Sequence, residues 1–344
     1  MKMNSPITIY DIAKEAEVSV TTVSRVLNGT APVKGSTRAK IMSIIEKHQF
    51  QPNAIARSLL KKQTGTIAII LPDITNPFFP EVFWGAENEA RDKGYTLFLC
   101  DTAGDYSRES QYLSVLRERR VDGIIYMGGR INLSQCPPEL AQEIIDLSKR
   151  VPIVLVNGNV PKGGFHRVYT DEALGAELAT QHLLDLGHRD IAFIGGLKEM
   201  STTMSKVKAY RRKLEQSGIP YRAERVLYGD YSIAAGKELM SRLLEGEEQP
   251  TAVFCVNDYT AVGAIKVIIE HGLRIPEDIS VIGFDDTPLA AAVIPELTTV
   301  SQHTHQLGKL SVEVLHRIIT KEQMTKRIVL TPELVERKST GPVR

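Results

Sequence analysis

The sequence predicts a small all-α head followed by a larger α/β body of two lobes built on parallel sheets. Two observations lead to this fold class. Residues 8–50 hold three short segments with apolar residues at helical spacing. From residue 66 onward, short apolar runs alternate with longer amphipathic stretches, which is typical of βαβ units whose strands lie parallel.

Composition excludes several classes of protein. The chain of 344 residues is 42% hydrophobic and 24% charged, which is ordinary for a globular protein. Its apolar runs, such as 66–71, are too short to cross a membrane, and no apolar secretion signal opens the sequence. Cys100, Cys136 and Cys255 are widely spaced, so we expect reduced thiols and a cytoplasmic location.

Charge is distributed unevenly along the chain. Residues 1–64 carry ten Lys or Arg and four Asp or Glu, whereas the remainder carries 32 and 37. A basic head on a mildly acidic body favours a polyanionic partner for the head. The same asymmetry would also fit an ordinary solvated surface.

The first segment of the head has the signals of a helix start. Thr8 and Asp11 have the spacing of a capping box. We expect a tight turn at Glu17, where such turns often hold glycine, and a left-handed residue other than glycine costs about 1 kcal/mol. The apolar face of this helix consists of Ile9, Ile12, Ala13 and Ala16.

The second segment, "SVTTVSRVLN" at 19–28, has three valines and two threonines, which are poor helix formers. Ser19 as N-cap and Asn28-Gly29 as a stop nevertheless predict a helix. Burial must then stabilise it, because its propensity does not. We expect the buried side chains to be Val23, Val26 and Leu27, with Ile41, Ile44 and Ile45 opposite them on a third helix within residues 36–50.

Two short helices joined by a tight turn and followed by a third form a helix-turn-helix. The start of the second helix offers short polar or methyl-bearing groups and one guanidinium, which can contact base edges in a DNA groove. A plain three-helix cap with a polar face would have the same spacing. The exposed positions expected are Val20, Thr21, Thr22, Ser24 and Arg25.

Polar and aromatic residues follow the apolar runs of the body. Parallel sheets bind ligands beyond the carboxyl ends of their strands. Amides and carboxylates bond hydroxyl pairs, and aromatic faces cover the C–H side of a sugar ring, so we expect a cleft for a polyol between two lobes. For Asp258 and Asp286 taken singly, capping of the next helix is the alternative. The segments are 73–82, 101–106, 157–159, 197–203, 229–232, 257–261 and 285–288.

The head resembles a known family. The run "ITIYDIAKEAEVSVTTVSRVLNG", then "TRAKI" and "QPNAIARSL", resembles the N-terminal signature of the LacI/GalR family of bacterial transcriptional repressors. In the body, "DITNPFF", "HLLDLGHRDIAFIGG" and "IPEDISVIGFDD" resemble the effector domain of that family. The resemblance implies two Rossmann-like lobes, as in periplasmic sugar-binding proteins.

The resemblance also implies a division of the chain. A helix-turn-helix head would occupy 1–50, a hinge helix and linker 51–64, and an effector-binding and dimerisation domain 65–340. The N-lobe would comprise about 66–166 and 297–326, and the C-lobe about 167–296 and 327–340. The chain would then cross between the lobes near 165–168, 294–297 and 325–328.

DNA contacts are implied position by position in the family motif. Val20 and Thr21 match the pair that sets sequence preference, and Arg25 matches a guanine-reading arginine. Phosphate contacts, which set register rather than sequence, are implied for Thr8, Tyr10, Ser19, Thr22, Ser24, Asn28 and Thr37.

Residues 52–60 match the hinge helix of the family, which orders on operator DNA and enters the minor groove. Ala56 would face the groove floor, and Asn53 and Arg57 would lie near sugar and phosphate. Leu59 would wedge into the central base step, although a core leucine is the alternative.

Effector contacts are implied for Phe78, Phe79, Asn157, Lys206, Tyr231, Asn257 and Asp285. Many sugar-responsive members have Asp in place of Asn157 and Arg in place of Lys206. The lysine resembles the catabolite-control branch, whose corepressor is a phosphorylated protein, but that branch has Arg in place of Ile294.

We therefore expect a sequence-specific DNA-binding repressor controlled by a small effector, a sugar or sugar derivative. Alternatives are the catabolite-control type and, more remotely, a sugar-binding protein without a DNA role. No GxSxG, HExxH, P-loop or metal-spaced Cys/His set occurs, so we expect no enzyme, metal or cofactor. Whether the effector induces or corepresses is left open, with induction the default.

Oligomeric state follows from the expected DNA site. One head offers one recognition helix, and two heads match a pseudo-palindrome. The sequence ends at "RKSTGPVR" without a heptad repeat, so we expect a homodimer rather than a tetramer.

Overall fold

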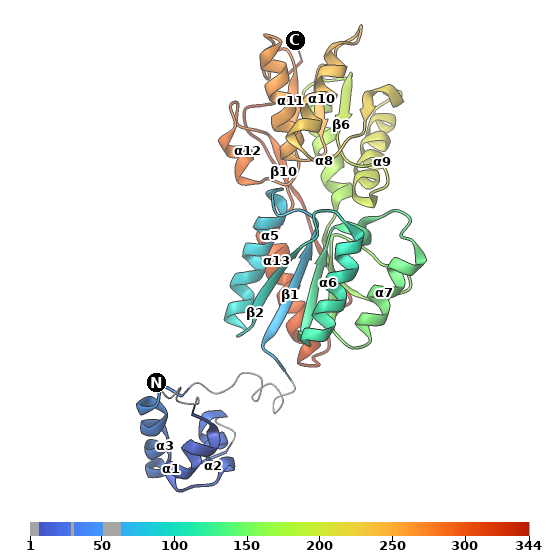
Figure 1. Ribbon diagram of the computed structural model, residues 1–344. Helices are drawn as coiled ribbons and strands as arrows, with labels where there is room; N and C mark the ends of the chain where they lie inside the picture. Colours follow the sequence, from blue (N-terminus) through green and yellow to red (C-terminus); the bar gives the residue numbers. More distant parts are fainter. Residues whose placement is uncertain (1–6, 29–30, 51–62, 344) are drawn as a thin grey trace, which may run out of the picture. The chain divides into compact units, whose positions relative to one another are not determined.

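The computed structural model describes residues 7–28, 31–50 and 63–343. The chain divides into two compact units, Met1–Thr64 and Gly65–Arg344, called here the head and the body (Figure 1). No helix among the described residues is long and apolar enough to span a bilayer.

The head consists of three helices, α1 (Ile9–Ala16), α2 (Val20–Asn28) and α3 (Gly35–Lys47). Thr8 and Asp11 form the expected capping box, and Glu17 is left-handed with φ of 56°. The helix with poor propensity, α2, is held by tertiary packing as predicted. The buried side chains of this core are Ile12, Ala13, Ala16, Val23, Val26, Ile41 and Ile44.

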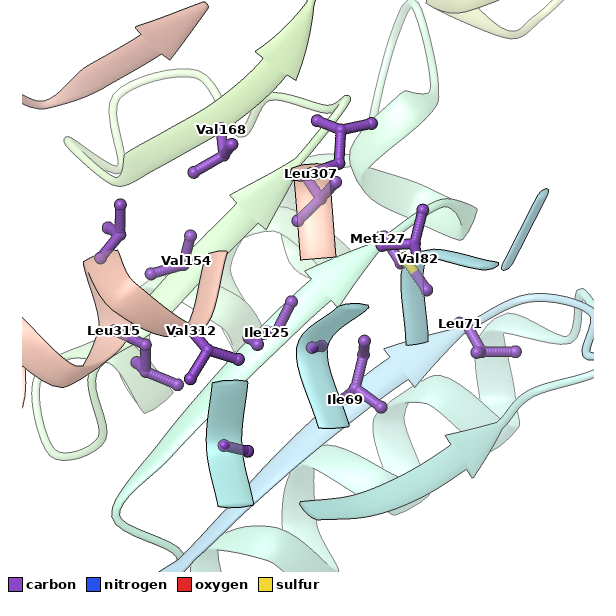
Figure 2. Packing of buried hydrophobic residues seen from close by; sticks show 14 of the residues in the cluster. Ile69, Leu71, Val82, Ile125, Met127, Val154, Val168, Leu307, Val312 and Leu315 are labelled. Atoms are coloured by element: carbon purple, nitrogen blue, oxygen red, sulfur yellow. The ribbon is translucent and has the colours of Figure 1, made fainter. Parts of the chain in front are cut away.

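The N-lobe of the body is a six-stranded parallel sheet with strand order β11-β5-β4-β3-β1-β2. Side chains from alternate positions of its strands face opposite sides, so each face has its own core. Helices α5 and α13 cover one face (Figure 2), and α6 and α7 cover the other. The elements are β1 (Thr66–Leu71), α5 (Phe78–Asp92), β2 (Thr96–Asp101), α6 (Tyr106–Arg119), β3 (Gly123–Met127), the 3-10 helix η1 (Gly129–Asn132), α7 (Pro138–Ser148), β4 (Ile153–Val156), β5 (His166–Thr170), α13 (Thr304–Ile319) and β11 (Arg327–Leu330).

The C-lobe is a four-stranded parallel sheet in the order β7-β6-β8-β9, with α8 and α9 on one face and α10 and α11 on the other. A short antiparallel pair, β10 with β12, lies beside it and is joined to it by bridges from Ile282 to Thr298 and from Asp285 to Ser301. The elements are α8 (Glu172–Asp185), β6 (Ile191–Ile194), α9 (Ser201–Gln216), η2 (Ala223–Arg225), β7 (Val226–Leu227), α10 (Ile233–Leu244), β8 (Ala252–Cys255), α11 (Asp258–Glu270), β9 (Ser280–Ile282), α12 (Pro288–Ala292), β10 (Thr299–Ser301) and β12 (Glu333–Val335).

The predicted lobe boundaries, 66–166 with 297–326 and 167–296 with 327–340, place the crossings too early. Strands β5 and β11 pair with each other within the N-lobe sheet, whereas β10 joins the C-lobe. The chain therefore crosses at Asp171, at 302–303 and at 331–332. These crossings are tied together, because the Asp171 N–H donates to the Leu330 carbonyl (3.1 Å) and the Thr170 hydroxyl to the Gln302 carbonyl (2.9 Å).

Helix pairs in both lobes approach closely at a glycine. A Cβ on Gly308 of α13 would lie 1.9 Å from the Val82 carbonyl oxygen of α5. A Cβ on Gly263 of α11 would lie 2.2 Å from the Ile233 carbonyl oxygen of α10. A larger residue at either glycine would push the two helices of its pair apart.

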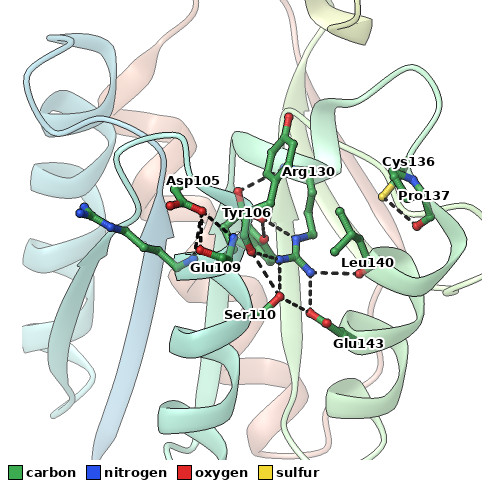
Figure 3. A network of polar contacts seen from close by, with 12 residues as sticks. Asp105, Tyr106, Glu109, Ser110, Arg130, Cys136, Pro137, Leu140 and Glu143 are labelled. Carbon is green, nitrogen blue, oxygen red and sulfur yellow. Dashed lines mark hydrogen bonds and ion pairs between the residues drawn. The ribbon is translucent and has the colours of Figure 1, made fainter.

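A buried ion pair lies inside the N-lobe (Figure 3). Arg130 of η1 and Glu109 of α6 are both almost fully buried, and Arg130 Nε donates to Glu109 Oε2 at 2.6 Å. Arg130 also contacts Glu143 of α7 (2.7 Å) and the Tyr106 carbonyl (2.5 Å). The guanidinium therefore joins η1 to both helices on that face of the sheet.

Candidate functional sites in the head and between the lobes

The second helix of the head presents its polar side to solvent. Thr21 and Arg25 are exposed, and Thr22 and Ser24 are half-buried. Val20, expected to be exposed, is half-buried and packs against the head core. The apolar Val20 side chain folds back onto that core, so α2 offers Thr21 and Arg25 most openly.

Most of the candidate phosphate-binding residues lie at or near the starts of the helices, whereas Ser24 lies within α2 and Asn28 ends it. Thr8, Tyr10 and Ser19 are exposed and Thr37 is half-buried. Thr8 and Ser19 also serve as caps, since Thr8 Oγ1 accepts from the Asp11 N–H (3.4 Å) and Ser19 Oγ accepts from the Thr22 N–H (3.2 Å). The Asn28 side chain and the hinge residues Asn53, Ala56, Arg57 and Leu59 lie outside the described part of the chain.

A cavity of about 660 Å³ lies between the two lobes. All seven polar and aromatic segments that follow the apolar runs contribute to its lining, as expected for the carboxyl ends of parallel strands. The structure also brings together every candidate effector residue in this lining: Phe78, Phe79, Asn157, Lys206, Tyr231, Asn257 and Asp285.

The N-lobe side of the cavity contributes three aromatic rings. Phe78 and Phe79, at the start of α5, are in edge-to-face contact with ring centroids 5.2 Å apart. Tyr106, at the start of α6, adds a third ring. Such rings provide apolar surface that can cover the C–H face of a sugar.

On the C-lobe side, a buried ion pair contains the single lysine of the lining. Lys206 Nζ on α9 lies 3.1 Å from Glu172 Oε1 at the start of α8. The same ammonium lies 4.3 Å from the centroid of the Phe284 ring. Lys206 is thus paired within the protein.

A chain of hydrogen bonds connects the lobes at the back of the cavity. Asn157 Nδ2 donates to Gln302 Oε1 (3.0 Å), and Gln302 Nε2 donates to Asp285 Oδ1 (2.6 Å). Burial raises the pKa of Asp285 well above its usual range, with the charge of Asp258 adding to the effect and Lys206 opposing it. This chain positions side chains from β4, the crossing segment and the loop after β9.

Asn257 and the two neighbouring acids act differently from expectation. Asn257 caps α11, because its Oδ1 accepts from the Thr260 N–H (2.9 Å). Asp258 is instead buried and accepts hydrogen bonds from Thr287 and Thr299. Asp286 pairs with Arg337 at 2.7 Å. The capping alternative for Asp258 and Asp286 is therefore wrong.

Two direct contacts close the cavity across the lobes. The Tyr259 hydroxyl of α11 donates to the Thr75 carbonyl of the N-lobe at 3.0 Å. On the other side, Leu133 bridges Met200, and the Ser134 N–H donates to the Glu199 carbonyl at 2.8 Å. The lining is thus held between lobes that touch at both rims.

Comparison with known proteins identifies the family. Residues 8–53 match the model of bacterial regulatory proteins of the lacI family, and residues 180–340 match a periplasmic binding protein-like domain. Catabolite control protein A of Priestia megaterium is 38% identical over 337 residues, which are 97% of this chain and 99% of that protein. The chain belongs to the lacI family. It is accordingly a transcriptional regulator with a DNA-binding helix-turn-helix head.

Other lacI-family proteins are similarly close. The transcriptional repressor PurR of Aliivibrio fischeri (strain MJ11) is 37% identical over 335 residues, covering 96% of this chain and 98% of that protein. The solved structure of the lac repressor dimer bound to operator and the anti-inducer ONPF has a TM-score of 0.85 and 27% identity, covering 98% of this chain and 100% of that chain. These relatives are regulators rather than enzymes.

Sequence reasoning missed several residues of the cavity in this lacI-family chain, among them Glu172 and Gln302. Glu172 follows β5 and Gln302 follows β10, and neither strand was predicted because both are short and rich in polar residues. The rule that ligand-binding residues follow parallel strands would have found Glu172, had "HRVYT" been interpreted as a strand.

Proposed function

We propose that this lacI-family regulator is a homodimeric repressor that binds a pseudo-palindromic operator in the cytoplasm. Its affinity for the operator changes when a sugar or sugar derivative occupies the cavity between the lobes. One observation carries the proposal: the chain that exposes Thr21 and Arg25 on α2 also brings all seven candidate effector residues into one cavity.

In this proposal the head reads bases mainly through Thr21 and Arg25. The Thr21 methyl suits the methyl group of thymine, and its hydroxyl can donate to or accept from a base edge. The Arg25 guanidinium suits guanine. Val20 contributes less than the motif implies, because it is half-buried. Thr8, Tyr10, Ser19, Thr22, Ser24, Asn28 and Thr37 set the register on phosphates, and Asn53, Ala56, Arg57 and Leu59 act in the minor groove.

A second copy of the chain is the proposed partner of the body. Phe98 on the edge strand β2 is 51% exposed, and Trp84 on α5 is 59% exposed. On the C-lobe, Ile269 of α11 is 52% exposed. Exposed apolar side chains on an edge strand favour covering by a partner, and two heads are needed for a palindrome. Sedimentation should give a dimer, and Phe98→Lys should shift it to monomer.

The effector would act by changing the angle between the lobes. A ligand that binds one lobe arrangement better than another shifts the equilibrium by its differential affinity, typically 1–3 kcal/mol. We propose induction, in which ligand binding weakens operator binding.

Selection of binding sites from a random DNA pool tests the proposal. The full chain should enrich a pseudo-palindrome, and Thr21→Ala should change the enriched half-site while affinity for non-specific DNA stays within about twofold. Ser43→Ala, an exposed residue of α3, is the matched control and should keep the wild-type half-site. Absence of any palindromic preference would falsify the proposed repressor.

This chain lacks the arginine expected for a catabolite-control regulator. Ile294, where that branch has Arg, is 84% exposed and uncharged, so the position offers no charge to a phosphorylated partner. The similarity to catabolite control protein A is matched by the similarity to PurR and does not separate the two. A sugar-binding protein without a DNA role is not favoured, because the lacI-family match covers the head.

A further inference from the structure

The charges that line the interlobe cavity are unbalanced. Five carboxyl groups line it, those of Asp73, Glu172, Glu199, Asp230 and Asp285. Lys206 is the only cation among the lining residues of the described chain. Glu172 pairs with Lys206, and burial raises the pKa of Asp285 well above its usual range. The excess negative charge therefore lies on the exposed carboxylates of Asp73, Glu199 and Asp230, which repel anions and attract cations.

The positive charge of Lys206 is already paired within the protein. Its ammonium is 3.1 Å from the Glu172 carboxylate and lies over the Phe284 ring, and its side chain is 5% exposed. In the sequence, Lys206 stands where many sugar-responsive members have Arg. In the structure, Glu172 already neutralises it.

Several hydrogen-bond donors of the lining are also used within the protein. Asn157 and Gln302 donate along the chain that ends at Asp285, and Asn257 Nδ2 donates to the Tyr231 carbonyl (3.1 Å). The Tyr259 hydroxyl donates to Thr75. These bonds use the Tyr259 hydroxyl and one of the two N–H groups of each amide, which leaves three N–H donors on these side chains.

Acceptors, in contrast, remain available. Asn132 Oδ1 is buried at the lining and has no hydrogen-bond partner. Carboxylate oxygens accept several hydrogen bonds each, and Asp230 Oδ1 accepts one from the Ser232 N–H (2.8 Å). A buried acceptor without a donor is costly, so the cavity favours a ligand that brings donors.

We infer that the cavity selects a donor-rich ligand without an anionic group, namely a neutral or amino-bearing sugar, and rejects sugar acids and sugar phosphates. This inference rests on the proposed function, because it names the ligand class of the proposed effector site. Hydroxyl and ammonium groups supply donors to the carboxylates, whereas a carboxylate or phosphate adds acceptors and negative charge to a site rich in both.

Matched sugar sets test the inference on the full chain. For the gluco, galacto and manno series, the hexose, the hexosamine, the uronate and the 6-phosphate are compared by thermal shift and calorimetry, together with neutral disaccharides. We expect at least one neutral or amino sugar to stabilise the protein, and its anionic counterparts to bind at least tenfold more weakly. Equal or tighter binding of a uronate or phosphate overturns the inference, as does a panel without any binding.

A charge variant tests the cause. Glu172→Gln keeps the shape but removes the charge that neutralises Lys206, so the anionic sugars should gain at least tenfold relative to their neutral counterparts. Glu177→Gln, on the same helix and paired with Arg212 away from the lining, is the matched control and should leave the preference unchanged. An unchanged preference in Glu172→Gln would count against the role assigned to this ion pair.

Operator binding without ligand separates this inference from the proposed function. If the same preparations bind a palindromic site but prefer anionic sugars, the repressor stands and the ligand class is wrong. If they bind no specific site, the proposed function itself fails.

Discussion

Each lobe of the body buries one carboxyl group away from the ligand cavity, and the two are held in different ways. In the N-lobe, Glu109 accepts from Arg130 and from the Tyr126 hydroxyl. In the C-lobe, Asp258 accepts only from neutral donors: the Thr287 N–H (2.7 Å), the Thr287 hydroxyl (2.9 Å) and the Thr299 hydroxyl (2.6 Å).

The difference appears in the titration of the two groups. Burial raises the pKa of Glu109, but Tyr126 and Arg130 oppose the shift. Burial raises the pKa of Asp258 to about 7, and the hydrogen bonds from Thr299 and Thr287 only partly offset it. Removing the cation of a buried ion pair is costly, because it leaves the carboxylate charged and unpaired. A buried carboxylate that is bonded only by neutral donors instead takes up a proton near neutral pH.

The largest expected effect comes from breaking the N-lobe pair. Arg130→Met leaves Glu109 buried without its cation, so the free energy of unfolding should fall by about 3–5 kcal/mol. Denaturant unfolding measures it. Lys149→Ala, which breaks an exposed pair with Asp146 on α7, should change it by less than about 1 kcal/mol. Similar losses in both variants would contradict the comparison.

The second prediction concerns pH and the C-lobe carboxyl. The folded-state pKa of Asp258 is about 7 and its ordinary value is 3.8, so between these values the folded chain holds a proton that the unfolded chain has lost. Unfolding free energy from this group therefore falls as pH rises through that window. From pH 5 to pH 7 the loss should be about 2 kcal/mol.

Asp258→Asn provides the reference for this measurement, because its amide does not titrate. Thermal or denaturant unfolding at pH 5, 6 and 7 should show the wild type losing stability relative to the variant. A constant difference across this range would mean that Asp258 stays ionised in the folded chain.

Helix packing is where the lobes should behave alike. Gly308→Ala and Gly263→Ala each place a Cβ about 2 Å from a carbonyl oxygen of the facing helix, so each should lower the unfolding free energy by about 1–3 kcal/mol. Gly35→Ala, where nothing lies within 4 Å, should be neutral or slightly stabilising. If Gly263→Ala left the unfolding free energy unchanged while Gly308→Ala lowered it, the lobes would also differ in their helix contacts.

The smallest expected effect is on the aromatic wall. Phe79→Leu removes one ring face from the cavity and should weaken every bound sugar by about 0.5–1.5 kcal/mol while preserving the order of preference among charged and neutral sugars. Calorimetry with the best ligand of the matched sets measures it. Phe165→Leu, a half-buried ring outside the lining, is the control. If Phe79→Leu changed the preference between neutral and anionic sugars, the aromatic rings rather than the carboxyl groups would determine that preference.

The head was largely predictable because its signals are contiguous in the sequence. Capping at Thr8, the left-handed Glu17 and the buried Val23 and Val26 all follow from local spacing. Val20 was misplaced, because position on a helix surface does not reveal that an apolar side chain folds back onto the core.

In the body, the rule for parallel strands located the cavity, but pairing between distant segments escaped prediction. Strands β5 and β11 pair although they are far apart in the sequence, so the crossings were placed too early. The state of Lys206 was missed for the same reason, since its partner Glu172 follows the unpredicted β5. Charge at a site depends on which side chains meet, and single segments do not contain that information.

The three crossings, at Asp171, 302–303 and 331–332, determine how the lobes can move. Each is one or two residues long between hydrogen-bonded elements, and the Asp171–Leu330 and Thr170–Gln302 bonds hold them side by side. Short tethers held together in this way restrict separation of the lobes and favour hinge rotation about the crossings. A ligand in the cavity would therefore act on the rest of the molecule through the angle between the N-lobe and the C-lobe.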